Sequence, residues 1–86
     1  MSANSPERRR VARAFGAVLR AARKERGLSQ EAICEGADID RTYASLLERG
    51  LRTPTLTVVI EIAQALGLEP AQLVFATLER LRDGVA

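Results

Sequence analysis

The stretch from Leu28 to Gly50 constrains the fold most, because it predicts two short helices joined by a sharp turn. Ser29 is a residue type that caps helix N-termini, and apolar residues follow it at three- and four-residue spacing. Asp38, at the corner, tolerates the left-handed backbone that a sharp turn needs. Asp40 is the next N-cap type, and a glycine at position 50 is typical of a helix end. Two such short helices cannot bury a core alone, so the rest of the chain must pack around them.

The remaining sequence predicts three more helices, and strand-like alternation is absent, so the expected fold class is all-α. The first helix is expected from Pro6 to about Arg26. A fourth is expected over about 56–66 and a fifth over about 70–82. The inward face of the fourth helix is expected to comprise Leu56, Val59, Ile62, Ala63 and Leu66.

The length of 86 residues predicts one domain. We expect a disordered N-terminus over 1–5, a single helix-turn-helix domain over 6–82 with its motif at about 29–49, and a frayed tail over 83–86. A domain of this size buries a small core, which makes efficient packing or dimerisation important.

The chain has no histidine and one cysteine, which argues against zinc sites, histidine acid–base chemistry and an internal disulfide. It also has no glycine-rich phosphate loop, so we expect neither an enzyme nor a cofactor or metal. Cys34 is interpreted as a small buried apolar residue rather than a redox switch. No apolar run approaches the ~18 residues of a membrane span, so a cytoplasmic protein without membrane contact is expected.

Charge is unevenly distributed along the chain, although the net charge is only +2. Residues 1–26 carry eight basic and two acidic side chains, whereas residues 27–52 carry three and five. The run Arg8-Arg9-Arg10, with Arg13, is either a solvated face or an extension that contacts a DNA backbone or minor groove. Any DNA affinity would therefore combine individually placed contacts with the first helix.

Polar side chains gather at the start of the second motif helix, at Arg41, Thr42, Tyr43 and Ser45. A helix-turn-helix reads the major groove with the N-terminal residues of its second helix. Arginine can bind guanine O6 and N7 together, and threonine offers a methyl to thymine and a hydroxyl to a base edge or phosphate. Two interpretations of Tyr43 remain open: its side chain packs in the core, or its hydroxyl is directed at a phosphate.

Several short motifs, in this order and spacing, resemble the Xre/Cro-repressor family of helix-turn-helix DNA-binding proteins over residues 15–74. They are Leu19-Arg20 with Arg23, Gly27-Leu28-Ser29-Gln30-Glu31, Arg41-Thr42-Tyr43, Leu47-Glu48-Arg49-Gly50, Arg52-Thr53-Pro54 and Ile62-Ala63-Gln64-Ala65-Leu66-Gly67-Leu68. The resemblance implies a five-helix, lambda-repressor-like domain. Ile39-Asp40-Arg41-Thr42-Tyr43, with an apolar fifth helix, looks most similar to the short controller proteins of restriction–modification systems.

The resemblance also implies roles for individual residues. It implies base contacts by Arg41, Thr42, Ser45 and, as a secondary candidate, Leu46. It implies DNA-backbone contacts by Gln30, Tyr43, Arg49 and Arg52. It further implies a structural ion pair between Arg23 and Glu48, on the first and third helices.

We expect a homodimeric transcriptional regulator of double-stranded DNA, because one unit of this size offers a small interface. A two-fold dimer would place two recognition helices about 34 Å apart on a near-palindromic operator. The expected dimer seam comprises Val58, Ile60, Val74, Phe75, Leu78 and Leu81, and the alternative is that some of them complete the monomer core. The rival function is an antitoxin-like or protein-interaction module, which the slightly acidic recognition segment favours. No small-molecule effector is evident.

Overall fold

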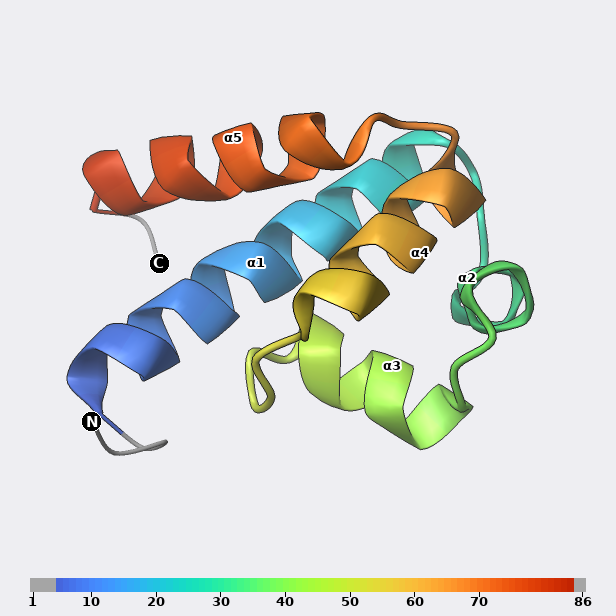
Figure 1. The fold of residues 1–86 in the computed structure, drawn as a ribbon, viewed down its shortest axis with the longest axis horizontal. Coiled ribbons are helices and arrows are strands. Elements are labelled where there is room, and N and C mark those ends of the chain that lie inside the picture. Colours follow the sequence, from blue (N-terminus) through green and yellow to red (C-terminus); the bar gives the residue numbers. More distant parts are fainter. Residues whose placement is uncertain (1–4, 85–86) are drawn as a thin grey trace.

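The computed structural model describes residues 5–84, and within that range the chain forms five helices and no strand (Figure 1). The helices are α1 (Pro6–Glu25), α2 (Gln30–Ala37), α3 (Arg41–Glu48), α4 (Leu56–Leu66) and α5 (Pro70–Arg82). The all-α prediction and the five expected helices are therefore confirmed, with bounds within one residue of those expected from the caps and glycines.

Side-chain caps explain where four of the helices begin. The oxygens of Ser5, Ser29, Asp40 and Thr55 each accept a hydrogen bond from the backbone N–H three residues further on, at 3.3, 3.0, 2.8 and 3.2 Å. Each bond satisfies a donor that the first turn of a helix leaves without an intrahelical partner. These starts are local properties of the sequence, which is why they could be predicted.

Each helix contributes one large, fully buried side chain to the hydrophobic core. These residues are Leu19, Ile33, Leu47, Ile62 and Leu73, and each is at most 1% exposed. The long α1 runs through the middle of the fold, with α5 packed on one side of it and α3 on the other (Figure 1). α2 packs against α3 and α4, so α1 and α4 together support the helix-turn-helix.

Gly16 allows α1 and α3 to approach very closely. A methyl group at this position would collide with the carbonyl oxygen of Leu47 and would lie 2.7 Å from that of Glu48. Both obstacles are backbone atoms at the end of α3, so they cannot move aside without displacing the helix. The absence of a side chain at Gly16 therefore sets how closely α3 lies against α1.

The structure corrects the expected inward position of Leu56, which is 74% exposed. Leu56 is the first residue of α4, and its side chain lies at the rim of an open groove rather than beneath a neighbouring helix. The other four residues of that face are buried as expected. Val58, expected in the dimer seam, is half-buried and packs against the core, which is the alternative that the sequence left open.

The expected boundaries at the ends of the chain need one correction. Ser5, a residue type that caps helix N-termini and stands directly before Pro6, accepts the N–H of Arg8 and caps α1, so it does not belong to the disordered N-terminus expected over 1–5. At the other end, the backbone N–H groups of Asp83 and Gly84 donate to the carbonyls of Glu79 and Leu81, at 3.0 and 3.2 Å. Helix-like hydrogen bonding therefore continues past Arg82. Residues 1–4 and 85–86, expected to be disordered and frayed, lie outside the described residues.

Across residues 5–84, no single helix has both the length and the hydrophobicity to cross a membrane. α4 and α5 meet those criteria only when taken together, and they are bent by 108° at the break between them.

Candidate nucleic-acid interface

The turn between α2 and α3 sets the direction of α3. Asp38 adopts the left-handed conformation, with φ 55° and ψ 47°, as the sequence predicted. The N–H of Ile39 then bonds the carbonyl of Cys34 at 3.0 Å, and its half-buried side chain packs against the core. Asp40 caps α3 immediately afterwards. The first turn of α3 therefore begins at the surface, while Ala44 and Leu47 anchor its inner face.

The expected base-contacting residues gather on the outer face of α3. Arg41 and Thr42 are exposed, and Ser45 and Leu46 are half-buried. These four side chains line one shallow, open depression of about 450 Å³, and Gln30 and Arg49 complete its lining. Six of the eight residues expected to contact DNA thus share one surface.

The two remaining residues lie elsewhere. Tyr43 is half-buried, and its side chain packs against the hydrophobic core. Arg52 is exposed in the loop after α3, where it lines a separate cleft together with Arg8 and Arg9 of α1.

Arg41 forms an ion pair that sequence reasoning did not identify. Its Nη1 lies 2.7 Å from Oε1 of Glu31, in the first turn of α2, and both side chains are about two-thirds exposed (67% and 66%). The two residues are separated by the turn, so only the angle between α2 and α3 brings them together. The pair holds one edge of the guanidinium and offsets its charge on the outer face of α3.

A largely buried network locks α3 to the rest of the domain. Arg23 donates to Glu48 through Nε at 2.6 Å and Nη2 at 3.0 Å, and through Nη1 to the carbonyl of Leu28 at 2.9 Å. Gln30 also donates to Glu48, at 3.3 Å. The side chains of Arg23 and Glu48 are only 13% and 5% exposed. The expected ion pair is therefore present, and it connects α1, α2 and the end of α3.

This network also affects the ionisation of Arg23. The hydrogen bond with Glu48 raises the pKa of the Arg23 guanidinium above its ordinary value, and this outweighs the opposing effect of burial. Arg23 therefore remains charged and committed to Glu48, which supports a structural rather than a DNA-contacting role.

Cys34 is half-buried on α2, close to the turn. Burial raises the pKa of its thiol, and this effect exceeds the opposing influence of Arg41. A thiol with a raised pKa is protonated at neutral pH and is a weak nucleophile. The environment of Cys34 therefore fits packing better than redox chemistry.

An apolar surface lies on α4 and α5. Four residues of the expected seam are substantially exposed: Ile60 (37%), Val74 (44%), Phe75 (57%) and Leu78 (42%). Leu81 is half-buried and lines an apolar groove of about 310 Å³ between α1, α4 and α5. Leu56, whose expected inward position is corrected above, lines the same groove. We call the expected seam without Val58, that is Ile60, Val74, Phe75, Leu78 and Leu81, the apolar face.

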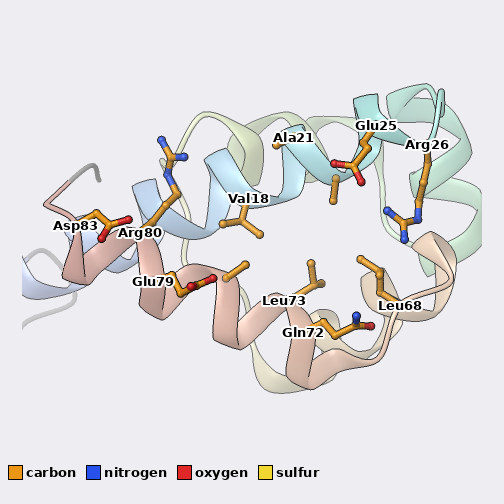
Figure 2. A pocket seen from close by; sticks show the side chains of 12 residues that line it. Val18, Ala21, Glu25, Arg26, Leu68, Gln72, Leu73, Glu79, Arg80 and Asp83 are labelled. Atoms are coloured by element: carbon orange, nitrogen blue, oxygen red, sulfur yellow. The ribbon is translucent and has the colours of Figure 1, made fainter.

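A further open pocket of about 550 Å³ lies between α1 and α5, away from the α3 surface. Figure 2 shows side chains of both charges around it, including Glu25, Arg26, Glu79, Arg80 and Asp83. The mixed charges give this pocket no preference for an anion such as a phosphate, so it does not extend the candidate interface.

Comparison with known proteins identifies relatives that match about two thirds or more of the chain. A model of the helix-turn-helix family matches residues 19–73. The HTH-type transcriptional regulator y4dJ of Sinorhizobium fredii is 44% identical over 57 residues, which cover 66% of this chain and 74% of the relative. The control protein C.MunI of a Mycoplasma species is 39% identical over 67 residues, or 77% of this chain and 89% of the relative.

Among solved structures, the restriction-modification controller protein C.AhdI from Aeromonas hydrophila is similar to this chain with a TM-score of 0.70 and 39% sequence identity. The alignment covers 72% of this chain and 94% of C.AhdI. Both the helix-turn-helix and the packing of the helices around it are therefore shared with a solved protein.

Proposed function

The chain belongs to the helix-turn-helix family of transcriptional regulators, and from this premise we propose that it binds a near-palindromic operator as a homodimer and reads its sequence through α3. The observation that carries the proposal is the single surface shared by Arg41, Thr42, Ser45, Leu46, Gln30 and Arg49. It lies at the first turns of the motif's second helix, the part that enters the major groove in helix-turn-helix complexes.

Each side chain on this surface has a proposed contact. Arg41 would bind a guanine edge, and Thr42 would offer its methyl and hydroxyl groups to the neighbouring base pair. Ser45 can hydrogen-bond a base edge, and Leu46 can contact a thymine methyl. These contacts would supply sequence discrimination rather than most of the affinity.

Contacts to the DNA backbone are proposed for the residues around that surface. Arg49 and Arg52 follow the C-terminal end of α3, and their positive charge attracts phosphates. Gln30 donates to Glu48 at 3.3 Å, which steadies an amide that also faces the depression. Tyr43 has its ring against the core, and a phosphate contact would come from its hydroxyl.

The apolar face supports a homodimer. Exposed apolar residues that cluster on one surface usually mark an interface. Specific DNA binding by so small a domain also calls for two half-sites, with recognition helices about 34 Å apart. A second copy that covers Val74, Phe75 and Leu78 would remove their exposed area from water.

We further propose that the regulated operator belongs to a restriction–modification system. The support is the similarity to C.MunI and C.AhdI, at 39% identity each. Genes for a restriction endonuclease and a methyltransferase beside this one would support the assignment, and a toxin gene would contradict it.

Binding to the DNA upstream of its own gene tests the proposed function. Fluorescence anisotropy should give tight binding that weakens steeply between about 50 and 200 mM salt, because phosphate contacts release counterions. Arg41→Ala should reduce the preference for this DNA over an unrelated duplex, because each half-site loses the discrimination at one base pair.

The alternative is a protein-interaction module that uses the same fold. The ion pair between Arg41 and Glu31 favours it, because it offsets a positive charge on the recognition surface. Absence of binding to any promoter, or binding that is insensitive to salt, would support this alternative and overturn the proposed function.

A further inference from the structure

We propose that the cleft between the start of α1 and the loop after α3 is a second DNA-backbone site, which binds phosphates beside those reached from α3. Its volume is about 400 Å³, and its lining includes Arg8, Arg9 and Arg52. We call it the arginine cleft. The inference rests on the proposed function, and it assigns a role to the arginine run that the sequence left open.

The arginine cleft is a fixed feature of the fold. Gly50, in the loop, adopts φ 72° and lies so near α1 that a Cβ there would be 2.8 Å from the Cα of Arg13. Ala12, on the floor of the cleft, is only 4% exposed. The two walls are therefore held together by close packing, and the arginines project from anchored backbone.

The position of the cleft suits an extension of the recognition surface. The loop that forms one wall leaves directly from α3, and Figure 1 shows the first turns of α1 on the same side of the molecule as α3. Arg49 on the α3 surface is followed by Arg52 in the cleft and then, across the gap, by Arg8 and Arg9. The arginines that line the α3 surface and the arginine cleft thus lie on the two sides of one short loop.

The arginine cleft and the α3 surface differ in the acidic residues around them. Among the described residues that line the arginine cleft, none is acidic. Oε2 of Glu7, the acid nearest in sequence, lies 3.8 Å from Nη1 of Arg10. On the α3 surface, Glu31 lies 2.7 Å from Arg41 and offsets its charge. Because phosphate neutralisation supplies much of the affinity of a DNA-binding protein, a cleft lined by basic and not by acidic side chains is a source of that affinity.

The chemistry of arginine matches the proposed ligand. A guanidinium presents a planar set of donors that pairs with two phosphate oxygens at once. Such contacts position a protein on the duplex without reading its sequence. The cleft should therefore strengthen binding to every duplex by the same factor. Its α1 wall precedes residue 19, where the match to the family model begins.

The double variant R8Q/R9Q tests the inference, with K24Q/R26Q as its matched control. The control removes the same charge from exposed positions at the other end of α1, roughly 24 Å away along the helix. Binding constants for the operator and for an unrelated duplex are measured by anisotropy from about 50 to 200 mM salt. The charge-preserving variant R8K/R9K is included, and thermal unfolding checks that all variants are folded.

R8Q/R9Q should weaken binding to both duplexes by a similar factor, about tenfold or more at 0.15 M salt. A dimer would lose four phosphate contacts, so the salt slope should fall by about 2–4. K24Q/R26Q should change either quantity much less, and R8K/R9K should recover only part of the loss, because lysine keeps the charge but not the planar donors of arginine. R8Q/R9Q binding that equals wild type, or that falls only as far as in K24Q/R26Q, overturns the inference but leaves the proposed function standing. Failure of the wild-type protein to bind any DNA overturns both.

Discussion

Replacement of Glu48 by alanine is expected to destabilise the domain by about 3–5 kcal/mol, because it leaves a largely buried positive charge without its partner. Glu48 is 5% exposed and accepts hydrogen bonds from Nε and Nη2 of Arg23 and from Gln30, at 2.6, 3.0 and 3.3 Å. After the substitution, the guanidinium of Arg23 would keep only its 2.9 Å bond to the carbonyl of Leu28.

This loss is large relative to the stability that a domain of this size can have. At the usual stability per residue, 86 residues give roughly 4–13 kcal/mol in total. A loss of 3 kcal/mol should lower the melting temperature by roughly 12–24 °C. The end of α3 would also lose its connection to α1 and α2, so DNA binding should weaken even where the variant remains folded.

Urea unfolding followed by circular dichroism measures the effect. Glu35→Ala, which removes an exposed carboxylate from α2, is the matched control and should change the free energy of unfolding by at most about 0.5 kcal/mol. The double variant R23M/E48L removes both charges and should recover most of the stability. A loss below about 1 kcal/mol for Glu48→Ala would show that the pair behaves like an exposed one and would refute the reasoning.

Three further predictions concern the packing, the recognition surface and the dimer. Gly16→Ala should destabilise the domain by about 1–3 kcal/mol in urea unfolding, because its methyl group would press on carbonyl oxygens of α3; unchanged stability would contradict the close approach of the helices. Glu31→Gln should reduce the preference for operator over unrelated DNA by about three- to tenfold in competition assays, because Arg41 would lose the partner that orients it; an unchanged ratio would show that the pair has no role in recognition. V74E/L78E should sediment as a monomer at concentrations where the wild-type protein is a dimer, because charges would enter the apolar face; a dimeric variant would place the seam elsewhere.

Much of the fold could be predicted because its determinants are local. The capping bonds of Ser29, Asp40 and Thr55 each join residues three apart, and the left-handed Asp38 is a single-residue property. The exposure of Leu56 could not be predicted in the same way. Helical spacing says which face a residue occupies, but not whether a neighbouring helix extends far enough to cover it.

At the candidate site, the sequence predicted the ion pair between Arg23 and Glu48 but not the one between Arg41 and Glu31. Exposure of Arg41 and Thr42 follows from their place at the start of a helix whose inner face is apolar. The contact between Arg41 and Glu31 could not be foreseen, because it depends on the angle at the turn. The arginine cleft depends likewise on the packing of the loop at Gly50 against α1, which brings together parts of the chain about forty residues apart in sequence.

Selection of binding sites from a randomised duplex library tests most directly whether α3 reads DNA. The wild-type protein should select two inverted half-sites, about 10 base pairs apart between centres, each with a guanine that the proposed contact of Arg41 requires. Arg41→Ala should still bind DNA and select the rest of the site, but lose the preference for that guanine in both half-sites. A selected sequence that is identical for the two proteins, or no selected sequence for the wild type, would contradict the account.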